Sequence, residues 1–278
     1  MIVFCCGLMR SGSTLQYKLT QTLVEKLGKG SGFGWLPSVQ NKEDLFYRAT
    51  ESDRDNYYIV KIHGYSPDFD DLIRQNKGKA IYVYRDLRDV VTSFMSWRKC
   101  SFDAVIRDQW LEKVIRDSKK WESLETIYIA KYEVLMQNLE KEVLAIAEHL
   151  GISISNDLAK EVAEQCSIDR QKKKTELMQS KQQKIDSQNI LHQNHISSGK
   201  SQRWLQELSA SEIAYIEQKT APWLLAHNYD LAYPNSVNRS ILATRENFNL
   251  FVSDCIFNAK RTKGHIDNYL KSSDSNEQ

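Results

Sequence analysis

Short runs of apolar, mostly β-branched and aromatic residues alternate along the first half of the chain with longer segments in which apolar residues recur every three or four positions. The short runs predict β-strands at 2–6, 57–62, 80–84 and 126–130. The longer segments predict helices at 13–27, 87–98, 103–121 and 134–150. Because strands and helices alternate, we predict an α/β fold with a parallel β-sheet flanked on both faces by helices.

Strand patterns fade after residue 152, and the C-terminal half is predicted to be helical. Helical periodicity continues there at 155–166, 169–184 and 209–227. Within this half, residues 168–203 are polar and form either a mobile cover over a site or a solvated helix and loop. We therefore predict one domain at 1–230 and a C-terminal extension at 231–278, with a helix at 241–270 and a polar tail.

A loop with two glycines follows the first predicted strand and opens the first predicted helix. Its sequence is Gly7-Leu-Met-Arg-Ser-Gly-Ser-Thr14, and its glycine spacing matches the phosphate-binding loop G-x-x-x-x-G-K-[ST]. In such a loop, backbone N–H groups and the helix dipole surround an anion. Ser13 stands where a nucleoside triphosphatase has its phosphate-binding lysine, and the nearest cation is Arg10. We therefore predict a three-layer sandwich like that of P-loop NTPases, with a cradle for a nucleotide other than ATP.

A second candidate anion site follows the third predicted strand. Arg85 ends that strand, and Ser93 lies eight residues later on the following predicted helix. Both side chains can converge on one anion, because an arginine donates paired hydrogen bonds and stays charged. The competing interpretation is structural, with Arg85 or Arg88 forming an ion pair with Asp86 or Asp89.

These two segments together resemble the nucleotide-binding signatures of sulfotransferases that use 3′-phosphoadenosine 5′-phosphosulfate (PAPS) as the sulfuryl donor. The resemblance implies a 5′-phosphosulfate site formed by Arg10, Ser11, Gly12, Ser13 and Thr14. It also implies that Arg85 and Ser93 hold the 3′-phosphate, the group that distinguishes this donor from ATP. The absent lysine of the nucleoside triphosphatase loop agrees with this resemblance.

Two later segments are also similar to the family. The segment that begins at Lys131-Tyr-Glu-Val-Leu resembles its Tyr-Glu-Asp-Leu segment, which implies that Tyr132 lies near the adenine. Ser198-Gly-Lys-Ser-Gln-Arg-Trp204 resembles a late Gly-x-x-x-x-Trp segment whose loop closes over the 3′-phosphate, which makes Gly199 and Lys200 candidates. Serines precede this glycine where the family often has a basic pair, so the contact can shift to Lys200 or Arg203. The resemblance spans residues 2–230 in order.

Sulfuryl transfer to a hydroxyl needs a base for the acceptor and positive charge near the leaving phosphate oxygen. Arg10 and the loop N–H groups can stabilise that charge, and the family resemblance adds Lys61 on the leaving oxygen. His63 follows the second predicted strand, and the Lys-x-His pattern of Lys61 and His63 matches the cytosolic branch, in which the histidine is the base. Other branches use a glutamate, which keeps Glu43 or Asp44 as a rival.

Composition limits the remaining possibilities. The net charge is only +2, so no global attraction to nucleic acid is expected. Five cysteines without C-x-x-C spacing, and no apolar run near 18 residues, lead us to expect a cytoplasmic protein without a metal site or membrane span. We expect a small-molecule, lipid or carbohydrate acceptor, with a hydroxyl or amine as the accepting group. The oligomeric state stays open.

Two other function classes share the loop. A P-loop nucleotide kinase or NTPase would need a phosphate-binding lysine and a metal-binding aspartate, and Asp86 is a weak version of the latter. A non-catalytic nucleotide-binding module would keep the loop without the chemistry. Nucleotide preference separates the first alternative from a sulfotransferase, and turnover separates the second.

Overall fold

The computed structural model describes residues 1–38, 42–47, 49, 51, 55–180, 185–186, 190–192 and 199–236. The chain divides into two compact units, Met1–Leu208 and Ser209–Gln278. The helix expected at 241–270 and the polar tail lie outside the described residues. In the part that the structure describes, no helix is long and apolar enough to cross a membrane.

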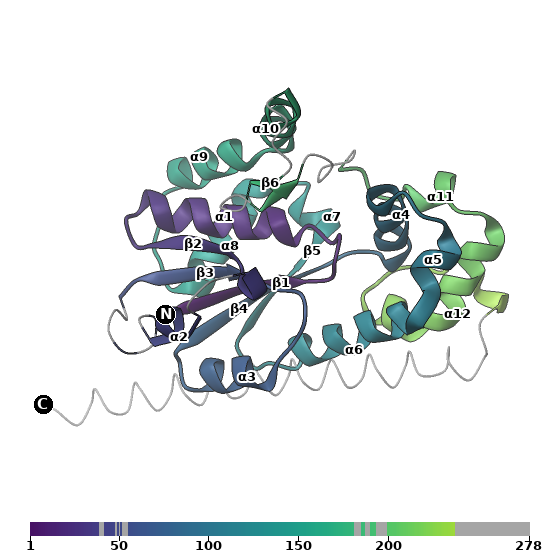
Figure 1. The fold of residues 1–278 in the computed structure, drawn as a ribbon, viewed down its shortest axis with the longest axis horizontal. Helices are drawn as coiled ribbons and strands as arrows, with labels where there is room; N and C mark the ends of the chain where they lie inside the picture. Colours follow the sequence, from purple (N-terminus) through teal and green to yellow (C-terminus); the bar gives the residue numbers. More distant parts are fainter. Residues whose placement is uncertain are drawn as a thin grey trace, which may run out of the picture. The chain divides into compact units, whose positions relative to one another are not determined.

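The first unit is built on a five-stranded parallel sheet with strand order β2-β3-β1-β4-β5 (Figure 1). Its strands are β1 (Ile2–Gly7), β2 (Gly30–Trp35), β3 (Tyr57–Lys61), β4 (Gly78–Tyr84) and β5 (Ile127–Lys131). The four strands predicted from the apolar runs are present, and their parallel pairing confirms the α/β prediction. β1 is central and fully buried, so the loop that follows it starts from a rigid position.

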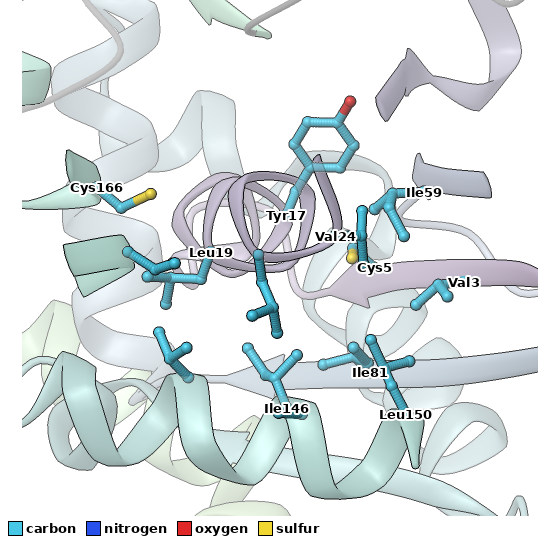
Figure 2. Packing of buried hydrophobic residues seen from close by; sticks show 14 of the residues in the cluster. Val3, Cys5, Tyr17, Leu19, Val24, Ile59, Ile81, Ile146, Leu150 and Cys166 are labelled. Atoms are coloured by element: carbon cyan, nitrogen blue, oxygen red, sulfur yellow. The ribbon is translucent and has the colours of Figure 1, made fainter. Parts of the chain in front are cut away.

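Helices cover both faces of the sheet, as the side-chain alternation of β1 requires. Val3 and Cys5 face one side, where they join the core with α1 (Ser13–Lys26), α8 (Leu139–Leu150) and α9 (Asn156–Cys166) (Figure 2). Phe4 faces the other side and contacts Phe69 of α3 (Pro67–Arg74), with ring centroids 4.7 Å apart. Phe69 in turn stacks on Trp121 of α6 (Trp110–Glu122). This is the predicted three-layer arrangement.

The first unit contains further helices in its described part. They are α2 (Lys42–Tyr47), α4 (Leu87–Arg98), α5 (Phe102–Ile106), α7 (Tyr132–Leu135), α10 (Ile168–Ser180) and α11 (Trp204–Glu207). The predicted helix at 169–184 corresponds to α10, and residues 181–184 lie outside the described residues. Two two-residue strands, β6 (Ile185–Asp186) and β7 (Leu191–His192), pair antiparallel.

Two segments predicted as single helices are each broken in the structure. The segment at 103–121 divides into α5, a 3₁₀ turn at Arg107–Gln109 and α6, because Gln109 adopts a left-handed conformation with φ 55°. The segment at 134–150 divides into α7 and α8. There, the Asn138 side chain accepts a hydrogen bond from the Lys141 N–H and starts α8 anew.

The described part of the second unit contains α12 (Ala210–Ala226) and a 3₁₀ turn at Pro234–Ser236. A capping box starts α12, in which Ser209 and Glu212 satisfy each other's backbone N–H groups. Glu217 is buried, and its two carboxylate oxygens accept hydrogen bonds from the N–H groups of Ala232 and Tyr233, both at 2.8 Å. The buried carboxylate therefore holds the chain that follows the helix.

β2 was not predicted from the sequence, although this strand carries Trp35 to the carboxyl end of the sheet beside Lys61. Its sequence, Gly30-Ser-Gly-Phe-Gly-Trp35, is too rich in glycine to show strand propensity. The glycine at position 30 is required by close packing, because a Cβ there would lie 2.0 Å from the Tyr57 carbonyl oxygen. The Gly34 N–H donates to Tyr17 Oη of α1 at 2.9 Å, which fixes the strand next to Trp35.

Replacing Gly30 by alanine tests this packing. Gly28→Ala is the control, because a Cβ at Gly28 meets no atom within 4 Å. We expect this control to lower the free energy of unfolding by about 1–2 kcal/mol, for its left-handed conformation alone. Gly30→Ala should cost about 1–3 kcal/mol more, because the backbone of β3 must move. Urea unfolding of both variants measures the difference, and equal losses of stability would contradict the packing argument.

Candidate functional site

The loop between β1 and α1 lies at the carboxyl end of the central strand, where open α/β sheets bind ligands. Ser11 of this loop is buried, and its Oγ lies 2.6 Å from the Leu8 carbonyl oxygen and 2.9 Å from the Val83 carbonyl oxygen in β4. The Ser11 N–H also donates to the Leu8 carbonyl at 3.1 Å. The side chain of Ser11 thus fastens the loop to the sheet.

Gly12 brings the loop into contact with Tyr132 of α7. It has a left-handed conformation with φ 94°, and a Cβ at this position would lie 2.6 Å from Tyr132 Cδ2. Ser13 and Thr14 follow as the first residues of α1. N–H groups in the first turn of a helix have no acceptor within the helix, so a helix start of this kind favours an anion.

Arg10 and Arg85 approach each other across this loop. The Arg10 Nε donates to Ser93 Oγ of α4 at 3.1 Å, and the Arg85 guanidinium reaches the Arg10 carbonyl oxygen at 3.5 Å. The Arg85 guanidinium also lies over the Tyr132 ring, 4.3 Å from its centroid. Four of the residues selected from the sequence, on four different segments, are therefore brought together.

The late segment at 199–204 contacts the same cluster through its main chain. Tyr132 Oη donates to the Gly199 carbonyl oxygen at 3.1 Å, and Arg85 donates to that of Lys200 at 2.8 Å. The Lys200 residue is exposed. Arg203 donates to Ser96 Oγ at 3.1 Å and forms an ion pair with Glu207. The structure thus places the backbone of Gly199 and Lys200 at the cluster.

Both ion pairs of the structural interpretation are also present. Arg88 pairs with Asp86 at 2.7 Å, and Arg85 pairs with Asp89 at 3.3 Å. All four side chains are buried. An ion pair and an anion site are compatible for Arg85, because its Nε is buried without a hydrogen-bond partner among the described residues.

Positive charge accumulates at this end of the sheet. Burial lowers the pKa of Arg10 to about 10, and the charges of Arg85 and Arg203 act in the same direction. Burial and the charge of Arg10 likewise lower the pKa of Lys61 to about 8. Burial is the larger cause of both shifts and neighbouring cations add to it, so an anion bound there would relieve the repulsion.

His63 and Lys61 extend the cluster along the carboxyl end of β3. His63 Nδ1 lies 2.8 Å from the Gly7 carbonyl oxygen, which only accepts, so Nδ1 carries the proton and Nε2 the lone pair. Lys61 Nζ lies 3.4 Å from that Nε2. Burial and the charge of Lys61 lower the pKa of His63 to about 3, which keeps its imidazole neutral.

Aromatic side chains surround His63. The Trp35 ring lies beside its imidazole, with centroids 5.0 Å apart, and Trp121 Nε1 donates to the His63 carbonyl oxygen at 3.2 Å. Sequence reasoning did not place Trp35 here, because its strand was not recognised. The rival base Glu43 is exposed on α2. Nothing is described of the Asp44 side chain.

Within the described residues, no group of three His, Cys, Asp or Glu side chains is placed to hold a metal ion. The cluster described above brings together the cations Arg10, Lys61 and Arg85 beside the start of α1. This arrangement suits a multiply charged anion. Its neutral imidazole, with a lone pair on Nε2, can also take a proton from a nearby hydroxyl.

The pKa of His63 gives a test of this environment. Unfolded chains bind a proton at an ordinary histidine pKa of 6.5, whereas folded His63 does so only near 3, so stability present above pH 6.5 is lost as the pH falls. Between pH 6.5 and about pH 5, the loss from this residue should be roughly 1–2 kcal/mol. In urea unfolding, the free energy of unfolding of His63→Gln should therefore fall by roughly 1–2 kcal/mol less than that of the wild type over this pH range. His149, whose pKa is also lowered, titrates in both proteins, and identical pH profiles would contradict the assignment.

Comparisons with known proteins give a consistent result. Residues 3–225 match the family model described as the sulfotransferase domain. Retinol dehydratase in complex with androsterone and inactive cofactor PAP is similar in structure, with TM-score 0.57, 16% identity and coverage of 84% of this chain and 83% of that chain. Mouse sulfotransferase SULT7A1 complexed with PAP gives TM-score 0.56, 12% identity and coverage of 79% and 84%. No curated protein sequence matches the chain significantly.

Proposed function

Because the chain belongs to the sulfotransferase family, we propose that it transfers a sulfuryl group from PAPS to a hydroxyl or amine of a small-molecule, lipid or carbohydrate acceptor. The observation that carries this proposal is the convergence of Arg10, Arg85 and Ser93 beside a helix N-terminus. Solved structures of the same fold hold PAP, the desulfated form of this donor. A retinol dehydratase complex holds androsterone, which supports a small-molecule acceptor.

The residues of the cluster fit a donor with two anionic ends. In the proposed arrangement, Arg10, Ser13 and Thr14 hold the 5′-phosphosulfate beside the start of α1. Arg85 and Ser93 hold the 3′-phosphate, and the buried Arg85 Nε supplies a donor that no described residue uses. The Tyr132 ring lies close to both Gly12 and the Arg85 guanidinium, which fits a place near the adenine.

PAPS supplies an activated sulfuryl group whose transfer leaves negative charge on the 5′-phosphate. Arg10 and the α1 N-terminus stabilise that charge without giving up a proton. Lys61 is near enough to Arg10 for the Arg10 charge to act on it, and its Nζ lies 3.4 Å from His63 Nε2. Its ammonium group can therefore donate a hydrogen bond to the bridging oxygen in this scheme. Positioning and electrostatics supply most of the rate enhancement in this scheme, as in phosphoryl transfer.

His63 is the proposed base. As the acceptor oxygen bonds to sulfur and the bond from sulfur to the phosphate oxygen breaks, the acceptor proton passes to His63 Nε2. The hydrogen bond from Nδ1 to the Gly7 carbonyl fixes the ring for this task. Bound anions raise the proton affinity of a buried imidazole, so the donor itself makes His63 a better base.

The alternative of a P-loop nucleotide kinase or NTPase is disfavoured. Ser13 occupies the position of the required lysine. Asp86, the candidate metal ligand, accepts hydrogen bonds from the Arg88 N–H and guanidinium and caps α4. Its carboxylate is thus committed to the first turn of α4.

Location and domain limits stay predictions. The described cysteines Cys5, Cys6, Cys100 and Cys166 are free thiols, which supports the proposed cytoplasmic location. The proposed catalytic domain at 1–230 contains every residue assigned here to the donor and the acceptor.

Nucleotide preference tests the donor assignment. In calorimetric titrations without magnesium, we expect PAP to bind more tightly than ATP, and Arg85→Ala to weaken PAP binding about 10- to 100-fold through the loss of charged hydrogen bonds. Arg74→Ala is the matched control, since Arg74 is an exposed arginine paired with Asp70 on α3. A preference for ATP over PAP that appears when the titrations are repeated with magnesium would support the kinase alternative instead.

Turnover tests the base. PAPS consumption should be measured with a phenol, an aliphatic alcohol and an amino sugar as acceptors. With any acceptor that is sulfated, His63→Gln should lower kcat about 10²- to 10⁴-fold while PAP affinity stays the same. The exposed Glu43 should tolerate replacement by glutamine. Loss of activity in Glu43→Gln alone would assign the base to the acidic rival, and no transfer to any acceptor by the wild type would favour the non-catalytic module.

A further inference from the structure

Asp89 is a buried carboxylate that lies behind the proposed 3′-phosphate site. It stands one turn after Arg85, near the start of α4, and its side chain is 1% exposed. One of its oxygens, Oδ2, pairs with the Arg85 guanidinium at 3.3 Å. A buried charge is tolerated only when it is paired and hydrogen-bonded, so the contacts of this carboxylate are needed to offset the cost of burying it.

The same carboxylate also holds the late segment at 199–204. Oδ2 accepts a hydrogen bond from the Gln202 N–H at 2.7 Å, and Oδ1 accepts one from the Trp204 N–H at 3.3 Å. Gln202 has a left-handed backbone with φ 62°, which costs about 1–2 kcal/mol for a residue with a side chain. The charged hydrogen bond from Asp89 compensates for this strain.

Arg85 and Asp89 both hydrogen-bond to the backbone of segment 199–204, Arg85 as a donor and Asp89 as an acceptor. Arg85 donates to the Lys200 carbonyl oxygen at 2.8 Å, while Asp89 accepts from N–H groups two and four residues later. Arg88 adds a further contact, with its guanidinium 3.9 Å from the centroid of the Trp204 ring. Segment 199–204 and Arg85 are therefore held as one unit through a single carboxylate.

We propose that Asp89 is a positioning residue that fixes Arg85 and segment 199–204 together for recognition of the donor's 3′-phosphate. The proposal rests on the proposed function, because it assigns Arg85 to that phosphate. Without the carboxylate, Arg85 loses its orienting partner and the segment loses two of its anchors at once. Loss of the Asp89 carboxylate should therefore weaken binding of the 3′-phosphate and leave binding of the 5′ end of the nucleotide unchanged.

The test compares PAP with adenosine 5′-monophosphate (AMP), which lacks only the 3′-phosphate. The dissociation constant of AMP divided by that of PAP, the AMP-to-PAP ratio, isolates recognition of that group. Asp89→Asn should lower this ratio at least about tenfold while AMP affinity stays within about twofold. In an Arg85→Ala background, the same substitution should have little further effect, because the two residues act as a pair.

Glu217→Gln is the matched control. Glu217 is also a buried carboxylate that accepts hydrogen bonds from two backbone N–H groups, but it holds residues 232 and 233 in the other unit. A comparable loss of thermal stability is expected in both variants, with the AMP-to-PAP ratio of dissociation constants unchanged in Glu217→Gln. A merely structural role for Asp89 would instead lower PAP and AMP affinity equally, and that result would overturn the proposal.

A measurement on the wild-type protein avoids any failure of the variant to fold. Amide hydrogen exchange at Gln202 and Trp204 should slow more with PAP bound than with AMP bound, because the 3′-phosphate stabilises the unit that Asp89 holds. Equal protection by the two nucleotides would overturn the role of Asp89. A wild-type protein with no preference for PAP over AMP would overturn the proposed function as well, whereas preference retained in Asp89→Asn would overturn only this inference.

Discussion

Concentrated positive charge at the carboxyl end of the sheet is the constraint on which the site depends. Arg10, Lys61 and Arg85 lie at the ends of three adjacent strands or in the loop that follows one of them. Lys61 and Arg85 are buried, and Arg10 is partly buried. Burial lowers the pKa of Arg10 and Lys61, and the repulsion between neighbouring cations lowers both further. Among the described residues, Asp89 is the carboxylate that pairs directly with Arg85. A fold that keeps these cations together is suited to bind an anion with several charges.

The sheet explains how the cations are kept together. β1 is buried on both faces. Val3 and Cys5 pack on one side (Figure 2). Phe4 packs on the other, so the loop at the end of β1 starts from a fixed point. Parallel neighbours on both sides of β1 bring His63 and Arg85 to the same edge. The geometry of the site is thus a consequence of strand order more than of any local turn.

Much of this arrangement could be predicted from the sequence, because the signals are local and repeated. Apolar runs predicted four strands that the structure contains, and the glycine loop predicted the start of α1, where the anion site is proposed. The strand β2 could not be predicted, since its glycines are selected by contacts with Tyr57 and Tyr17 that only the folded chain reveals. Asp89 appeared in the sequence as one possible ion-pair partner, but its bonds to Gln202 and Trp204 join residues more than a hundred positions apart.

The central claim is that one cluster of residues binds both anionic ends of the donor. A crystal structure of the protein with PAP would test it most directly. The account predicts the 5′-phosphate against the loop at 7–14 and the start of α1, and the 3′-phosphate about 3 Å from the Arg85 guanidinium. PAP bound elsewhere, or bound with its 3′-phosphate turned away from Arg85, would contradict the account.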